Sequence, residues 1–118
     1  MSMEENKEIL RHLTQEFNGY NGDVVKIRAL YERYLAADYV GHSLLRGDLS
    51  RQQRIESVVM SVPAMPDLNY SADDMLAEGD KVVTRYTARG THKGTFMGIP
   101  ATGKQIVVKG VEINRIVD

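Results

Sequence analysis

Glu112 has the residue type and the surroundings that acid–base chemistry requires. It belongs to an alternating stretch in which every second residue falls on one face of a predicted strand: Ile106, Val108, Gly110, Glu112, Asn114 and Ile116. A carboxyl group among apolar side chains has its pKa raised by desolvation, so it can exchange protons near neutral pH. Glu112 is therefore predicted to be a catalytic acid or base. The alternatives are a solvent-facing carboxylate, or one paired with Arg85 or Arg115 across the sheet.

Two further side chains are predicted to assist Glu112. His42 follows a short extended segment, residues 37–43, and an imidazole can shuttle a proton or hydrogen-bond a ligand carbonyl near neutral pH. The alternative is that the His42 ring only fixes its loop by bonding to the backbone. Arg85 lies in the middle of another predicted strand, where an inward orientation would let it stabilise an enolate. An outward orientation would make Arg85 an ordinary exposed residue, and the alternation of that strand leaves both open.

The other histidines do not suggest a metal site. His92 lies in the glycine-rich turn of residues 90–94 and is predicted to take a rim or solvent-facing role. His12, His42 and His92 fall on a helix, a loop and a turn, without the close spacing of zinc-binding motifs. The segment Gly98-Ile99-Pro100 lacks the Lys-Ser or Lys-Thr ending of a phosphate-binding loop. No metal is predicted.

Most of the aromatic side chains are expected to form the core, because aromatic residues at helical spacing usually do. A few are also predicted to line a cavity, together with Asn114 from the strand of Glu112. The predicted lining is Phe17, Tyr34, Phe96, Met97 and Asn114, with Phe96 and Met97 acting as a flap at the mouth.

Helices are predicted first along the chain. Ser2 with Glu5, and Ser50 with the glutamine three residues later, are typical of capping boxes at helix starts. Asp23 can cap a second helix between them. Apolar residues recur at helical spacing after each cap. Pro63 and Pro66 are predicted to end the third helix.

Strands are predicted in the second half of the chain, where the period changes to two. They run from about 68 to 77, from 82 to 89 and from 105 to 117, with a tight turn at 78–81 and a glycine-rich stretch at 90–103 that pairs in part. Three helices followed by strands joined by short turns predict an α+β fold, with helices on one face of an antiparallel sheet. Such a sheet curls around its helices and leaves a cavity at its open end.

Composition limits the classes of function. The 118 residues suit a single domain, residues 1–118, and a net charge of −1 with scattered bases argues against a nucleic-acid partner. The absence of cysteine excludes thiolate chemistry and disulfides. The acidic N-terminus does not resemble a secretory signal, and no apolar run reaches the roughly 20 residues that span a bilayer. A cytoplasmic location is expected.

Several segments in order resemble the SnoaL-like polyketide cyclases of the nuclear-transport-factor-2-like superfamily. They are residues 38–43 (Asp-Tyr-Val-Gly-His-Ser), 65–68 (Met-Pro-Asp-Leu), 77–83 (Ala-Glu-Gly-Asp-Lys-Val-Val), 90–104 (Gly-Thr-His-Lys-Gly-Thr-Phe-Met-Gly-Ile-Pro-Ala-Thr-Gly-Lys) and 110–116 (Gly-Val-Glu-Ile-Asn-Arg-Ile). The resemblance covers roughly residues 4–118 and is to the family as a whole.

This resemblance implies a cone-shaped, curved antiparallel (mixed) sheet wrapped around three N-terminal helices. It also implies a hydrophobic cavity, a homodimer, and chemistry without metal or cofactor. Founding members close a ring in an aromatic polyketide by intramolecular aldol chemistry. Near the position of Glu112 the family carries a polar side chain, often histidine. Before the histidine that matches His42 it carries an acidic or amide residue, where this chain has Gly41.

The chain departs from the family at its C-terminus. Typical members continue past the equivalent of Asp118 into a final strand that supplies an acidic residue, so that residue cannot be assigned here. The chain is then a shortened member, or its sequence is incomplete. The expected function is a cofactor-independent acid–base enzyme that cyclises or isomerises a small hydrophobic carbonyl compound. The alternative is a non-catalytic ligand-binding or dimerisation module of the same fold.

Overall fold

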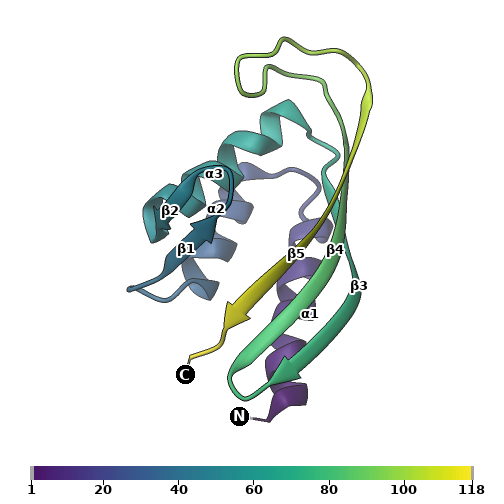
Figure 1. Cartoon of the computed structure of the whole chain (residues 1–118). Helices are drawn as coiled ribbons and strands as arrows, with labels where there is room; N and C mark the ends of the chain where they lie inside the picture. The colour runs from purple at the N-terminus through teal and green to yellow at the C-terminus, as the bar shows by residue number, and fades with distance from the viewer. Residues whose placement is uncertain (1, 118) are drawn as a thin grey trace.

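The computed structural model describes residues 2–117, so Met1 and Asp118, the ends of the predicted domain, lie outside the described residues. The elements follow the predicted order of helices before the main strands (Figure 1). The helices are α1 (Met3–Gly19), α2 (Val24–Tyr34) and α3 (Arg51–Ala64). The strands are β1 (Val40–Ser43), β2 (Gly47–Ser50), β3 (Asn69–Glu78), β4 (Lys81–Thr91) and β5 (Gln105–Arg115). None of the described helices is long and apolar enough to cross a membrane.

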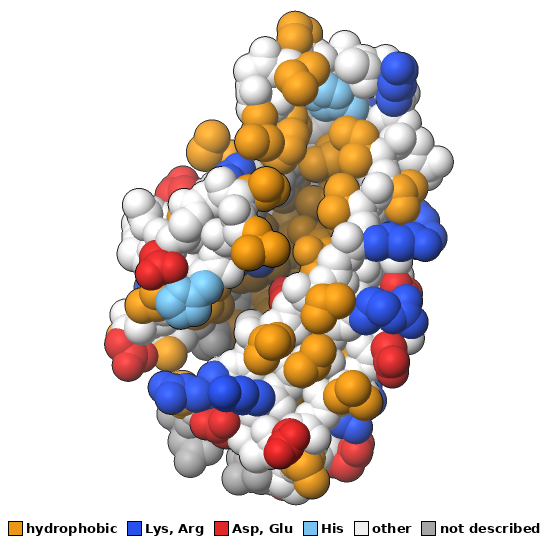
Figure 2. All heavy atoms as spheres, in the orientation of Figure 1, with side chains coloured by type: hydrophobic (Ala, Val, Ile, Leu, Met, Phe, Trp, Pro, Cys, Tyr) orange, Lys and Arg blue, Asp and Glu red, His pale blue; other side chains and the backbone are white. Residues whose placement is uncertain are grey.

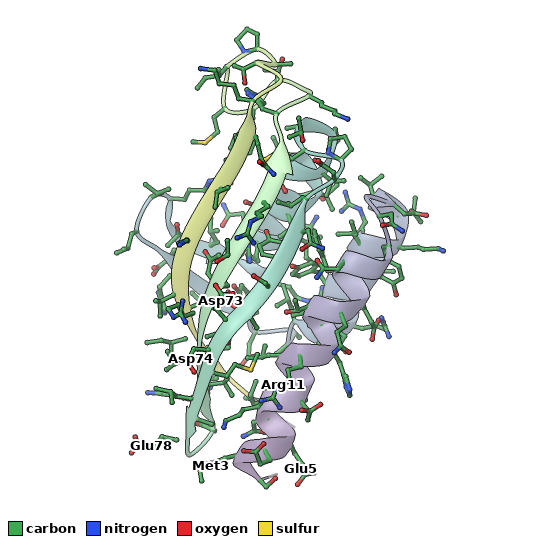
Figure 3. All side chains as sticks on the ribbon, turned by 90° about the vertical axis from the view of Figure 1, so that its right-hand side faces the viewer. Met3, Glu5, Arg11, Asp73, Asp74 and Glu78 are labelled. Atoms are coloured by element: carbon green, nitrogen blue, oxygen red, sulfur yellow. The ribbon has the colours of Figure 1, made fainter. Side chains whose placement is uncertain are left out.

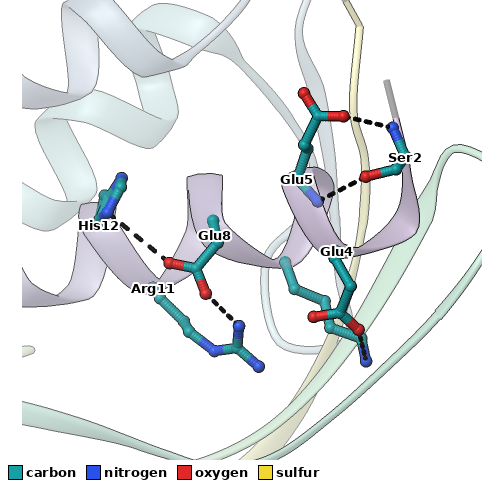
Figure 4. A network of polar contacts seen from close by, with 7 residues as sticks. Ser2, Glu4, Glu5, Glu8, Arg11 and His12 are labelled. Atoms are coloured by element: carbon teal, nitrogen blue, oxygen red, sulfur yellow. Dashed lines mark hydrogen bonds and ion pairs between the residues drawn. The ribbon is translucent and has the colours of Figure 1, made fainter.

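The predicted helix starts are confirmed. At α1 the Ser2 hydroxyl accepts a hydrogen bond from the Glu5 amide at 3.1 Å, and the Glu5 carboxylate accepts one from the Ser2 amide at 3.1 Å (Figure 4). The same reciprocal pair joins Ser50 and Gln53 at α3, and Asp23 caps α2. Each cap satisfies backbone donors that the first turn leaves without partners.

The third helix ends between the two prolines predicted to stop it: Pro63 lies inside its last turn and the helix continues to Ala64. A proline in the last turn removes one backbone donor, which is a small loss where few intrahelical bonds remain to be made. The helix is also held by buried Val58 and Val62 on the preceding turns. It ends at Met65, whose amide donates to the Ser61 and Val62 carbonyls at 3.0 and 3.1 Å.

The main sheet is antiparallel, in the order β3-β4-β5. Alternation along the central strand β4 assigns its two faces. Val82, Thr84 and Ala88 are 0%, 4% and 8% exposed and form the inner face, which packs against the helices. Arg85 belongs to the opposite, outer face. The sheet therefore buries one side under the helices, as the sequence predicts.

Helix α1 lies along β3 and fixes the position of that strand. The Asn18 side chain donates to the Tyr70 carbonyl at 2.7 Å and accepts from the Tyr70 amide at 2.9 Å, so it pairs with the strand as another backbone would. Figure 3 shows Arg11 of α1 on the side of the helix that faces β3, where Asp73 and Asp74 lie. A groove of about 520 Å³ lies between these two elements. The core beneath is formed by buried side chains of all three helices: Phe17, Ile27, Leu30, Tyr31, Ile55, Val58 and Val62.

Two segments pair more extensively than the sequence predicts. The extended segment at 37–43 becomes β1 and forms a separate two-stranded antiparallel sheet with β2, a strand that was not predicted. The glycine-rich stretch beyond β4 continues as an irregular hairpin, in which the His92 amide donates to the Lys104 carbonyl at 2.9 Å. A tight turn closes this hairpin, with left-handed φ angles of 52° at Met97 and 81° at Gly98.

Candidate functional site

The inner face of the sheet is open beside β5. In Figure 1, β5 lies on one side of the molecule and α3 with the β1–β2 hairpin lies on the other. Figure 2, in the same orientation, shows a hollow between these two parts, with hydrophobic side chains along its walls. Among residues 2–117, β5 is the edge strand of the sheet at this opening. The hollow is therefore a trough, open to water along one strand.

Glu112 lies on the inner face of β5, directly opposite Thr84 of β4, and Asn114 lies opposite Val82. Burial raises the pKa of the Glu112 carboxyl, while the charge of Arg54 and hydrogen bonding from Asn114 act in the opposite direction and are outweighed. The Glu112 side chain nevertheless remains exposed to solvent. The two observations agree if the carboxyl stands inside a concave surface, where water reaches it from one side and protein surrounds it on the others.

Arg54 of α3 is the cation whose charge lowers the pKa of this carboxyl against the effect of burial. It is partly buried, and its guanidinium lies 6.0 Å from the centre of the Tyr31 ring. Burial is the largest single influence and would lower the pKa of Arg54. The Coulombic influence of Tyr31, Tyr39, Tyr70 and Glu112 leaves that pKa raised overall. Arg54 is therefore charged at every physiological pH.

Aromatic rings form the floor behind these charges. The Phe17 ring meets Tyr31 edge-on at 6.4 Å between centres and Tyr70 at 5.0 Å, and Tyr70 meets Tyr86 at 6.1 Å. Burial raises the pKa of Tyr31 and of Tyr70, and the Glu112 charge adds to both shifts. Both phenols therefore stay protonated and can donate hydrogen bonds.

The inner face between Glu112 and the helices also holds a buried polar atom. The Thr84 hydroxyl oxygen is buried and, among the described residues, has no hydrogen-bond partner. Beside this pair of residues, Gly110 lies opposite Tyr86, and a Cβ on Gly110 would meet the Tyr86 hydroxyl at 2.6 Å. The glycine therefore leaves room for the Tyr86 ring to lie across β5.

The structure brings two of the predicted site residues together and separates two others from them. Glu112 and Asn114 share the inner face of β5. His42 lies on β1 with a side chain that is 77% exposed, and its Nδ1 is 2.7 Å from a carboxylate oxygen of Asp48. Arg85 points to the outer face, where it is 57% exposed and lies 3.9 Å from Asp73. The inward orientation on which its predicted role depended is not the one that the structure has.

The predicted lining residues are dispersed. Phe17 is buried in the core at 3% exposure, where its ring contacts the aromatic floor. The Tyr34 hydroxyl donates to Glu16 of α1 at 3.3 Å, at the contact between the first two helices. Phe96 is partly buried and Met97 is 68% exposed, and both lie at the tip of the β4–β5 hairpin.

Of the two roles predicted for His92, rim or solvent-facing, the solvent-facing one is wrong. The side chain is 5% exposed, and its Nδ1 lies 3.0 Å from the Thr102 hydroxyl. The hairpin that encloses it is longer than the turn assumed from the glycines, because backbone pairing continues past β4. Among residues 2–117, no group of three acidic or histidine side chains is placed to hold a metal ion.

Arg54, Tyr31 and Tyr70 are the members of this site that sequence reasoning missed. Arg54 directly precedes Ile55 on the apolar stripe of α3, so a charge at the border of a buried stripe was the available signal. Tyr31 was assigned to the core, which is where its ring lies. Its hydroxyl end could be placed only once the helices and the sheet were known.

The assembled side chains can perform acid–base chemistry. A carboxyl with a raised pKa lies on the inner face of β5, and its charge influences the pKa values of a charged guanidinium and of two protonated phenols. A proton acceptor beside donors that can stabilise a developing negative charge is the arrangement that proton abstraction next to a carbonyl requires. A smaller groove of about 330 Å³, near Asn21 and Lys93, contains none of these groups, and the groove beside α1 is lined by Tyr70 but not by Glu112, Arg54 or Tyr31.

Comparisons with known proteins agree on the fold. Residues 11–118 match the family model described as SnoaL-like polyketide cyclase. AclR from Streptomyces galilaeus, described as a candidate hydroxylase, is 29% identical with a TM-score of 0.83 over 99% of this chain and 83% of its own. A candidate polyketide cyclase from Acidithiobacillus ferrooxidans is 30% identical, with a TM-score of 0.74 and the same two coverages.

A third structure supports the fold alone. The candidate SnoaL-like polyketide cyclase from Jannaschia sp. CCS1 has a TM-score of 0.83 at 20% identity, over 98% of this chain and 79% of its own. No curated protein resembles the chain closely enough to count as a match.

Proposed function

The chain belongs to the SnoaL-like polyketide cyclase family, and from this premise we propose that it is a cofactor-independent acid–base enzyme acting on a small hydrophobic carbonyl compound. The reaction is cyclisation or isomerisation next to the carbonyl group. The hollow between β5 and α3 is the proposed binding pocket, and Glu112 is the proposed base.

The placement of Glu112 is the observation that carries this proposal. Its carboxyl lies on the concave face, its pKa is raised by burial, and water still reaches it. In the ionised form it takes a proton from the carbon next to the substrate carbonyl, and the electron pair of that C–H bond moves towards the carbonyl oxygen. In a cyclisation the resulting carbon nucleophile attacks a second carbonyl, and Glu112 returns its proton to the new alkoxide. In an isomerisation Glu112 returns the proton to another carbon.

The relatives do not assign one reaction. The Acidithiobacillus protein is described as a candidate polyketide cyclase, whereas AclR is described as a candidate hydroxylase. One fold can host several chemistries, so the proposal depends on the side chains of this site and not on the fold alone.

Hydrogen–deuterium exchange at carbon tests the proposed base without knowledge of the natural substrate. The bicyclic ketones 1-indanone and 2-tetralone would be incubated with the protein in D₂O, and loss of the α-proton signal would be followed by NMR. We expect wild-type protein to accelerate the exchange and Glu112→Gln to reduce the acceleration by about 100-fold or more, because the amide cannot accept the proton.

The matched control is Glu78→Gln, at the exposed end of β3 and remote from the hollow. It should exchange at the wild-type rate, and all three proteins should melt within a few degrees of one another. Equal rates for wild-type and Glu112→Gln protein, or no acceleration above buffer by the wild type, would contradict the proposal.

A second candidate function is a non-catalytic binding or dimerisation module. It is favoured by the outer face of β5, where Val111 and Ile113 are 64% and 67% exposed between the exposed Lys109 and Arg115. As a sheet edge, β5 also presents backbone groups that a second chain can pair with. This candidate is compatible with a homodimer that is also an enzyme, so the exchange experiment is the one that separates the two functions.

A further inference from the structure

Arg54 is a charged side chain whose donors lack protein acceptors. It is only partly exposed and adjoins Ile55, which is 1% exposed. Within residues 2–117 its guanidinium forms no hydrogen bond or ion pair, and its contact is with the face of the Tyr31 ring. By contrast, Arg28 and Arg33 each have a glutamate partner. A guanidinium has five N–H donors, and holding them without acceptors in a partly buried position is unfavourable unless water or a ligand supplies the acceptors.

The nearest available anion does not satisfy Arg54. Glu112 lies opposite buried Thr84 on the inner face of β5, its charge helps to raise the pKa of Arg54, and the charge of Arg54 opposes the raised pKa of Glu112. They nevertheless form no ion pair within the described chain. A direct pair would have neutralised both charges. Held apart, the guanidinium can contact one atom of a ligand while the carboxyl acts on another.

Tyr31 and Tyr70 carry hydroxyl groups without hydrogen-bond partners among the described residues. The Arg54 guanidinium is 6.0 Å from the centre of the Tyr31 ring, and Tyr70 joins the same aromatic cluster through Phe17. In the described part of the chain, the tyrosine hydroxyls that form hydrogen bonds are those of Tyr20 and Tyr34, both to Glu16.

The inner face contributes a further hydroxyl without a partner. Thr84, which is 4% exposed, lies opposite Glu112 and leaves its hydroxyl unsatisfied among the described residues. A guanidinium and phenol hydroxyls that lack protein acceptors point to a ligand that carries an electron-rich oxygen.

We infer that Arg54, with the hydroxyl groups of Tyr31 and Tyr70, binds the substrate oxygen that becomes negative when Glu112 removes the proton. This inference rests on the proposed function of Glu112 and assigns the other half of the site. As the C–H bond breaks, its electron pair forms a carbon–carbon double bond, and the carbonyl π pair moves to the oxygen. Arg54 donates hydrogen bonds to that oxygen. The substrate class is a small apolar molecule with an enolisable carbonyl or an acidic conjugated hydroxyl, such as a 1,3-dicarbonyl compound or a phenol.

The pair 4-nitrophenol and nitrobenzene tests this assignment without turnover. The 4-nitrophenolate ion is yellow and carries an anionic oxygen conjugated with an apolar ring, whereas nitrobenzene lacks that oxygen. Binding of each would be titrated to wild-type, Arg54→Met, Arg54→Lys and Glu112→Gln proteins, with the phenolate followed by its absorbance. We expect Arg54→Met to weaken phenolate binding by about 10-fold or more and to leave nitrobenzene binding within about 2-fold.

Two further variants make the expectation specific. Arg54→Lys retains the charge without the planar fork of donors, so it should bind phenolate between the wild-type and Arg54→Met values. Glu112→Gln should bind phenolate more tightly than wild type, because it removes a competing negative charge. The control Arg46→Met, at an exposed arginine bonded to Ser57, should match the wild type for both probes.

The outcomes separate this inference from the proposed function. If Arg54→Met weakens the binding of 4-nitrophenolate and of nitrobenzene equally, Arg54 has a structural role. If Arg54→Met leaves phenolate binding unchanged, Arg54 has no role in binding. Either result overturns the inference, even if ketone exchange still depends on Glu112. Selective loss of phenolate supports the anion site, even if no ketone exchange is catalysed. If Arg54→Met fails to fold, as judged by circular dichroism, the comparison of Arg54→Lys with wild type decides the question, and equal binding overturns it.

Discussion

The protonation of Glu112 links the site to the stability of the chain. Its pKa in the folded protein is raised from 4.5, mainly by burial. Between 4.5 and the raised value the folded state therefore binds more protons than the unfolded state, so stability falls as the pH rises through this window. A glutamine at this position cannot ionise, so the variant does not lose stability in this way as the pH rises. We expect Glu112→Gln to melt close to wild type at pH 4 and above it at pH 8, by no more than about a few degrees because the carboxyl is also exposed to solvent.

The measurement is a pair of thermal melts for each protein at the two pH values. The effects of other titrating groups cancel when the wild-type melting temperature is subtracted from that of the variant at the same pH. For the control Glu78→Gln, this difference in melting temperature should be the same at both pH values. A difference that moves the other way, with wild type gaining on the variant as the pH rises, would mean that Arg54 stabilises the carboxylate more than burial disfavours it.

At the scale of single residues, the sequence predicts what depends on strand alternation. Alternation alone places Glu112 and Asn114 on one face, and the register of β5 against β4 makes that face the inner one. The same rule could not decide which way Arg85 points, because each face of β4 carries both polar and apolar residues. Arg54 was missed for another reason: its role depends on the approach of α3 to β5, two elements about 50 residues apart in the chain.

At the scale of elements, Gly110 controls how β4 and β5 fit together. A Cβ on this residue would lie 2.6 Å from the Tyr86 hydroxyl and 2.8 Å from the adjoining ring carbon, so the Tyr86 ring would have to move. We expect Gly110→Ala to lower the free energy of unfolding by about 1–3 kcal/mol. Gly19→Ala, where no atom lies within 4 Å of the added Cβ, should instead be neutral or stabilising by up to about 1 kcal/mol. Urea unfolding of both variants would test the contrast, and an unchanged midpoint for Gly110→Ala would contradict it.

The elements themselves were largely predictable because local chemistry specifies their ends. Ser2, Asp23 and Ser50 each offer a side-chain oxygen to the first turn of a helix, and each helix begins there. Strand β2 was not predictable in this way, since its four residues, Gly47–Ser50, lack a clear apolar alternation and pair only with β1. The end of α3 was predictable from its two prolines: Pro63 is accommodated in the last turn, and Met65, which precedes Pro66, is outside the helical conformation.

At the scale of the whole molecule, β5 has two faces with different tasks. Its inner face carries Glu112 and bounds the hollow, whereas its outer face exposes Val107, Val111 and Ile113, at 50%, 64% and 67%. Apolar residues that gather on one exposed sheet face are typical of an association surface. A partner there would leave the mouth of the hollow free, because the two faces point in opposite directions.

We therefore expect the chain to form a homodimer through the outer face of β5, a state that sedimentation velocity can measure directly. Val111→Lys places a charge at the centre of the exposed apolar group, next to Arg85 across the strand pair, and should convert the dimer to monomer. The control Val25→Lys changes a valine that is 75% exposed on α2, away from the sheet, and should leave the dimer intact.

A wild-type protein that sediments as a monomer at about 100 µM, a concentration well above the dissociation constants of stable homodimers, would exclude this interface. Dimerisation unaffected by Val111→Lys would assign it to another surface. If Val111→Lys gives monomers that still exchange ketone protons, association and catalysis use separate faces of the same strand.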